Sequence, residues 1–273
     1  MKIYFFLFIL SILLISCEDV VDSQELPYIE ELVIKGILEA GKPLQGLTIT
    51  RTLPPLEEYS IEKATVRNAD AFISYKNVKY KLSYDSATNT YFNKELPVES
   101  QGVYHLAVKW QGLQASAETR IPEPIEIDSF SLRGRFVKAD RGGDHWEYDL
   151  IANFIPKAKS AYAAFIKEQF SDYYTYYTSY RTRDTLKNGN MALPVYNIWL
   201  YNNEDAEVFF VSNNYMCYID CYDEPFYNYF LSRYNGGSDG DIFGTSGTNI
   251  KGNIKGGIGL FLGFSRTSKK VSF

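Results

Sequence analysis

Few side chains in this sequence could act as a general base at neutral pH. The chain has two histidines, His105 and His145, and no H-E-x-x-H pair that would hold a catalytic zinc. A Ser-His-Asp triad would need one of these two imidazoles. His105 lies between Tyr104 and Leu106, and successive side chains of a strand point to opposite faces. We therefore expect Tyr104 and Leu106 to share an apolar face and His105 to face solvent on the other side. We therefore predict no catalytic residues and a protein that is not an enzyme.

Two acidic, glycine-rich loops are the best candidates for metal binding. They are Asp140–His145 and Ser238–Asp241. Calcium takes six to eight oxygen ligands, and neither loop has the D-x-D-x-D-G spacing with a later glutamate. Aspartate is also common in turns because it tolerates unusual backbone angles. Gly257-Ile258-Gly259 does not begin a dinucleotide fingerprint either, because the third glycine, Gly263, comes one position late. We predict no metal and no cofactor.

Cys217 and Cys221 could form a disulfide if the chain is exported into an oxidising compartment. In an extended strand, residues four apart are separated by about 13 Å, which is beyond disulfide reach. A bridge therefore requires residues 218–220 to turn. We favour the disulfide, with two free thiols as the alternative.

The stretch from Tyr162 to Tyr180 is unusually rich in aromatic residues. Exposed tyrosine rings can stack on sugars or anchor a protein interface. The competing interpretation is an ordinary β-sandwich core with hydroxyls at its rim. The residues of the candidate binding surface are Tyr173, Tyr174, Tyr176, Tyr177 and Tyr180.

The first seventeen residues combine one positive charge with a short apolar run. Lys2 precedes the almost wholly apolar stretch Ile3–Ile15, which ends at Ser16-Cys17. Such a run is typical of a signal peptide and is shorter than the roughly twenty residues of a transmembrane helix. A small residue before the cysteine resembles the lipobox of bacterial lipoproteins, in which this thiol is acylated and becomes the mature N-terminus. We expect residues 1–16 to be removed and Cys17 to anchor the chain in a membrane. The alternative is an ordinary signal peptide or anchor with an incidental cysteine.

Residues 17–28 are polar and turn-prone, and predict a lipidated flexible tether. Glu18 and Asp19 directly follow the cysteine, and this acidic pair resembles the surface-export signal of Bacteroidota lipoproteins. The resemblance implies the cell surface rather than the periplasmic face. A plain solvated linker is the alternative.

The rest of the chain predicts a mainly β protein. Aromatic residues make up 16 % of the sequence, which favours strands. Short alternating segments with frequent turn signals predict an N-terminal Ig-like or transthyretin-like antiparallel sandwich over 29–121. The prolines of Ile121-Pro122-Glu123-Pro124 mark a joint. We expect a second β-rich domain over 125–273, with one helix near 225–234 and a last strand at Ile258–Phe264.

Charge excludes one class of partner. The formal net charge is −5, or about −6 once the leader with its single Lys2 is removed, and no long basic run occurs. Nucleic-acid binding needs clustered Lys and Arg, so we expect none.

Several short motifs, in this order, resemble a Bacteroidota family of outer-membrane lipoproteins classed as a domain of unknown function. They are the lipobox at Cys17, Gly102-Val103-Tyr104-His105-Leu106, the joint Ile121–Pro124, and Asn253-Ile254-Lys255-Gly256-Gly257-Ile258-Gly259-Leu260-Phe261. The family is typically encoded beside TonB-dependent receptors and has no established activity. The resemblance implies an accessory or ligand-binding subunit of such a receptor, anchored in the outer membrane. A surface adhesin or glycan-binding module, using the aromatic region, is the alternative, and the ligand would be a glycan or a peptide.

Overall fold

The computed structural model describes ten stretches of the chain, and everything below refers to them. They are residues 28–138, 145–168, 176–177, 180–182, 186, 190–200, 207–208, 210–211, 214–234 and 250–273. Outside these stretches lie Cys17 with the predicted leader, most of the predicted tether, Tyr173, Tyr174 and nearly all of both acidic loops.

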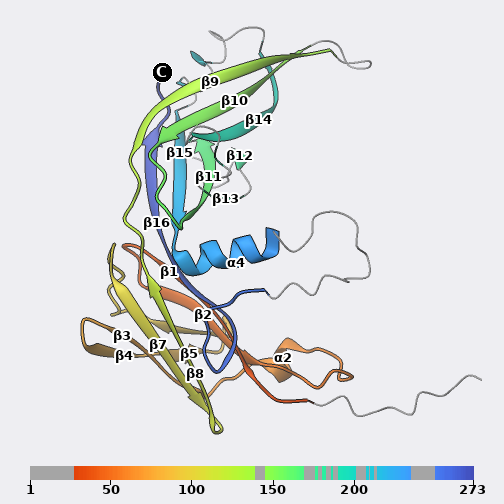
Figure 1. Ribbon diagram of the computed structural model, residues 1–273, viewed down its shortest axis with the longest axis vertical. Helices are drawn as coiled ribbons and strands as arrows, with labels where there is room; N and C mark the ends of the chain where they lie inside the picture. Colours follow the sequence, from red (N-terminus) through yellow and green to blue (C-terminus); the bar gives the residue numbers. More distant parts are fainter. Residues whose placement is uncertain are drawn as a thin grey trace, which may run out of the picture.

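The protein is mainly β, as the sequence predicts, and its strands form three sheets (Figure 1). The largest sheet has nine strands. In spatial order they are β12 (Tyr176–Tyr177), β11 (Ala161–Glu168), β15 (Tyr215–Tyr222), β16 (Gly257–Lys270), β1 (Leu32–Glu39), β2 (Leu44–Arg51), β6 (Thr90–Asn93) and β5 (Ser83–Asp85), with β13 (Arg181–Thr182) also on β11. The second sheet consists of β4 (Val78–Lys81), β3 (Asp70–Tyr75), β7 (Val103–Trp110) and β8 (Leu113–Arg120). The third consists of β14 (Asn190–Leu200), β10 (His145–Phe154) and β9 (Ile127–Val137).

Strand β16 belongs to both halves of the molecule. Its first part, Gly257–Phe264, runs parallel to β1, and its second part, Phe264–Lys270, runs antiparallel to β15. The sequence predicts a strand that ends at Phe264, and the observed strand continues for six residues because it acquires this second partner. We call β1–β8, which surround one core, the lower sandwich, and β9–β15, which surround the second core, the upper sandwich. In Figure 1 β16 runs along the molecule from the lower sandwich to the upper one.

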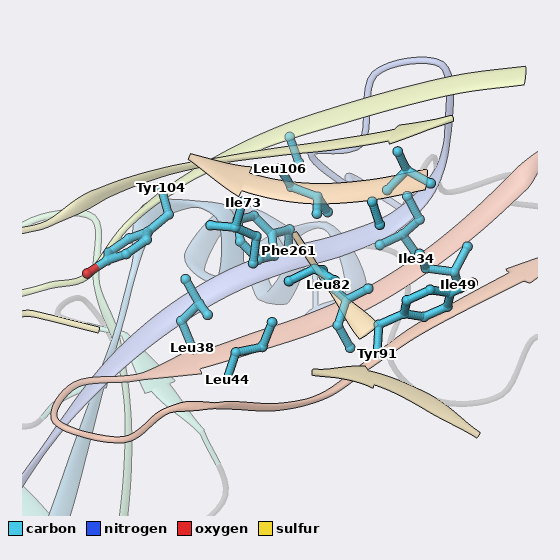
Figure 2. Close-up of a cluster of buried hydrophobic side chains, with 14 of the residues drawn as sticks. Ile34, Leu38, Leu44, Ile49, Ile73, Leu82, Tyr91, Tyr104, Leu106 and Phe261 are labelled. Carbon is cyan, nitrogen blue, oxygen red and sulfur yellow. The ribbon is translucent and has the colours of Figure 1, made fainter. Parts of the chain in front are cut away.

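The lower sandwich follows the sequence pattern closely. The inward positions of β1, Leu32, Ile34 and Leu38, are fully buried, and Phe261 of β16 packs in the same core (Figure 2). The turn Lys76-Asn77 has positive φ at both residues, as expected of a tight hairpin. These elements make a core from residues that alternate along each strand.

Two local predictions need correction. The sequence predicts one strand from Val78 to Tyr84, but Leu82 separates β4 from β5, which lie in different sheets. The Leu82 side chain is buried and its N–H donates to Ala71 O at 2.9 Å, so the chain changes sheets at this residue. A second short helix, α2 (Ile61–Ala64), was not expected; the expected helix is α4 (Glu224–Tyr234).

Tyrosine hydroxyls hold the chain at the entry to two strands. Tyr104 donates to Pro97 O at 2.9 Å and accepts from Glu99 N at 2.6 Å, in the manner of the tyrosine corner of Ig-like sandwiches. Tyr162 of β11 accepts from Lys157 N at 2.5 Å in the upper sandwich. The Gly102-x-Tyr104 motif therefore has a structural role.

Candidate functional site

The structure places the predicted aromatic surface in part. Tyr176 and Tyr177 form β12, whose backbone pairs with Ile166 and Phe165. Tyr180 is 39 % exposed, and its ring packs edge-on against aromatic neighbours. The nearest of these rings is Phe226 of α4, at 4.8 Å between centroids.

The predicted disulfide between Cys217 and Cys221 is wrong. Both lie in the continuous strand β15, point into the upper core and are free thiols. Because the strand does not turn between them, their spacing stays near the extended value of about 13 Å. Burial raises the pKa of Cys217 to about 12 and that of Cys221 to about 11.

Of the two histidines, the structure describes the side chain of His105. His105 is exposed, as expected, with Nδ1 3.3 Å from Glu118 Oε2 on the neighbouring strand. Within the described stretches no three His, Cys, Asp or Glu side chains are grouped to hold a metal. Residues 236–240 have the spacing G-x-S-x-G in the sequence and lie outside the described stretches.

A hollow with a mostly apolar lining lies beside α4, where the two sandwiches meet. We call it the junction groove; it has a volume of about 860 Å³. Its lining residues come from β1, α4, β16 and two connecting segments. They are Val33, Ile34, Lys35, Ile37, Tyr180, Phe226, Tyr229, Phe230, Arg233, Ile250, Gly252, Ile258, Gly259, Leu260 and Leu262.

The floor of the junction groove is the outward face of β1 and β16. Parallel pairing places Val33 beside Ile258, Lys35 beside Leu260, and Ile37 beside Leu262. An outward strand face is usually polar, because only the opposite face packs on the core. Here five of the six side chains are aliphatic, and Ile37 and Ile258 are 40 % and 48 % exposed.

Helix α4 forms one wall, and Asp223 fixes where it begins. Asp223 Oδ1 accepts from Phe226 N at 3.0 Å, which caps the first turn, and Oδ2 accepts from Gly263 N at 2.8 Å on β16. The hydroxyl of Thr119 on β8 also bonds to Oδ2. Burial raises the pKa of this carboxyl to about 7, although all three hydrogen bonds favour its charged form. The Asp223 side chain thus joins helix α4 to β16 of the nine-stranded sheet and to β8 of the four-stranded sheet.

Asn253 has a similar role on the same strand edge. Its Oδ1 accepts from Phe261 N at 2.8 Å, and its Nδ2 donates to Phe261 O at 2.7 Å and to Glu118 O at 2.9 Å. Asn253 and Asp223 therefore satisfy the backbone of β16 at Phe261 and Gly263 on the edge away from β1, where the pairing with β15 has not yet begun. Gly256 and Gly259 have positive φ, and a Cβ at either would collide with a backbone carbonyl. The glycine-rich motif therefore allows backbone segments to approach closely at both positions.

The charged residues of the junction groove are both cationic. Lys35 and Arg233 have no carboxylate partner within the described stretches. The Arg233 guanidinium lies over the Tyr229 ring, 5.9 Å from its centroid, with Nη1 3.4 Å from the tyrosine hydroxyl. Sequence reasoning identified Tyr180 but missed the floor and both cations. The available signal was the apolar outward positions of β1.

None of the helices in the described residues is long and apolar enough to span a bilayer. Comparison with curated proteins finds no match. A family model does match, over residues 20–270 of the 273-residue chain. The chain therefore belongs to the DUF4249 family, a domain of unknown function.

Proposed function

We propose that this protein is a lipid-anchored lipoprotein of the bacterial outer membrane that serves as an accessory or ligand-binding subunit of a TonB-dependent receptor. The lipobox at Cys17 supports the anchor. The family motifs support an association with a TonB-dependent receptor, since the Bacteroidota lipoproteins that this chain resembles are typically encoded beside one.

The observation that carries the binding role is the junction groove. It is a concave, mostly apolar surface with a few polar groups, which is the usual character of a ligand site. Its lining joins segments far apart in the sequence, so it exists only in the complete fold. Rigid strands form its floor, which favours binding without large rearrangement.

The receptor association is tested by affinity purification of the tagged full chain from native membranes. We expect an outer-membrane barrel to co-purify reproducibly. The matched control is the same tagged chain carrying Cys17→Ala, which cannot be acylated and should leave the membrane fraction. Repeated recovery of the acylated chain without any barrel would count against the proposal.

The anchor and its membrane face are tested separately. Mass spectrometry of the native product should show a mature N-terminus at acylated Cys17. Protease added to intact cells should cleave the chain if Glu18 and Asp19 direct surface display. Protection until the outer membrane is opened would place the protein on the periplasmic face instead.

A glycan-binding surface module is the second candidate. It is favoured by the exposed ring of Tyr180 within the aromatic region. Glycan arrays should then give signals that fall on Tyr180→Ala and on Tyr174→Ala with Tyr176→Ala. Silent arrays, or binding unchanged in these variants, would remove this candidate.

A further inference from the structure

We propose that the junction groove binds a long-chain carboxylate, with the hydrocarbon along β1 and β16 and the acid group near Lys35 and Arg233. This inference rests on the proposed binding function and names its ligand class. It follows from the apolar lining of the groove, from the backbone pairing of β1 and β16, and from the positive charge of the two charged lining residues.

The first observation is the apolar character of the groove. Ile37, Ile258 and Ile250 are 40 %, 48 % and 58 % exposed, and each lies on the same hollow. Leu260 is partly buried beside them, and the rings of Tyr229 and Phe230 form the wall. Covering such aliphatic surface with a hydrocarbon chain removes it from water, which is favourable in proportion to the area covered.

The second observation is the scarcity of polar groups able to bind a peptide or a sugar. β1 and β16 pair with each other along Leu32–Glu39 and Gly257–Phe264, and Asn253 and Asp223 satisfy part of the remaining edge of β16. A peptide backbone placed here would therefore find few hydrogen-bond partners, and burying it unpaired is costly. The described lining contains no Asp, Glu, Asn or Gln to hold sugar hydroxyls. A hydrocarbon needs none of these partners.

The third observation is charge. The whole chain has a formal net charge of −5, yet the only charged lining residues in the described part are cations. Lys35 extends from the floor next to Leu260, while Arg233 is held over Tyr229 on the wall. Two cations without carboxylate partners favour an anionic group on the ligand, and the hydrocarbon lining requires that this group end an apolar chain.

Photoaffinity labelling of the full chain in isolated outer membranes tests the inference. The probe is palmitic acid carrying a diazirine and an alkyne, and the comparison probes are the matching alcohol and a diazirine phosphatidylethanolamine. We expect the acid to label peptides containing Tyr229–Arg233 or Ile258–Leu262, and free palmitate to compete. Equal labelling by the alcohol, preferential labelling by the phospholipid, or labelling mapped elsewhere would overturn the inference.

A charge-reversal pair gives the matched control. Lys35→Glu with Arg233→Glu should reduce labelling about tenfold at subsaturating probe, since two exposed ion pairs are replaced by two repulsions. Lys79→Glu with Lys109→Glu changes the net charge equally on exposed strand positions away from the groove and should have no effect. Equal labelling of both double variants would refute the role of the two cations.

The two proposals fail separately. A barrel that co-purifies with a chain that takes up no fatty acid would refute the ligand class alone. Specific labelling of the groove in a chain that never recovers a barrel would refute the receptor association alone.

Discussion

The buried carboxyl of Asp223 should make the stability of this protein fall as pH rises from acid to neutral. Its pKa is raised from 3.8 to about 7 by burial, while in the unfolded chain the group is solvated. The folded protein therefore binds a proton more tightly than the unfolded chain does. The stabilisation is complete below pH 3.8 and is lost as pH rises to about 7.

The magnitude follows from the difference between the two pKa values. A shift from 3.8 to about 7, at 1.36 kcal/mol per unit, corresponds to about 4 kcal/mol of unfolding free energy. Asp223 is 3 % exposed, so solvent screens the carboxyl little. Other groups titrate in the same range, so the wild-type curve alone does not isolate this effect.

Comparison with Asp223→Asn isolates the contribution of this carboxyl to the pH dependence of stability. The amide cannot titrate, and it loses one acceptor for Gly263 N–H or Phe226 N–H, which costs about 1–3 kcal/mol. Urea unfolding of both chains, followed by tryptophan fluorescence between pH 4 and 8, measures the difference. We expect the stability advantage of the wild type to shrink by about 4 kcal/mol from pH 4 to pH 7, and then to stay constant. A difference that does not change with pH would refute the buried carboxyl at the start of α4.

Four further predictions concern stability and thiol chemistry, the first three measured by the same urea unfolding at pH 7. Gly259→Ala should cost at least about 2 kcal/mol, because φ is +123° and the added Cβ would meet a backbone carbonyl. Asn253→Ala should cost about 2–3 kcal/mol, since three hydrogen bonds between β8, β16 and its side chain are lost. Tyr104→Phe should cost about 1–2 kcal/mol, because it removes the hydroxyl that both donates and accepts. Cys217 and Cys221 should resist iodoacetamide at pH 8 in the native protein and react after denaturation, as mass spectrometry would show; rapid native labelling would contradict their burial.

The sequence predicts individual strands well because a strand with one buried face alternates with a period of two. Leu32, Ile34 and Leu38 illustrate this, as does the hairpin at Lys76-Asn77. Helix α4 was also predictable, from aromatic spacing and a proline in its first turn.

Strand partners were not predictable, because alternation says which face is buried but not which strand lies alongside. β1 and β16 come from opposite ends of the chain, and no local signal links Leu32 to Gly257. For the same reason the junction groove was invisible in the sequence. Lys35 and Arg233 line the same hollow only because the fold places α4 beside β16 (Figure 1).

Because β16 pairs with strands of both sandwiches, the protein can complete its fold only after β16 has been synthesised. The fourteen-residue strand β16, Gly257–Lys270, is central to the long sheet and pairs with β1, which leaves the ribosome long before it. Loop closure over such a separation is slow, and neither sandwich has its full sheet until β16 has been synthesised. A chain built in this way therefore stays incompletely folded until β16 has been synthesised and has paired with both β1 and β15.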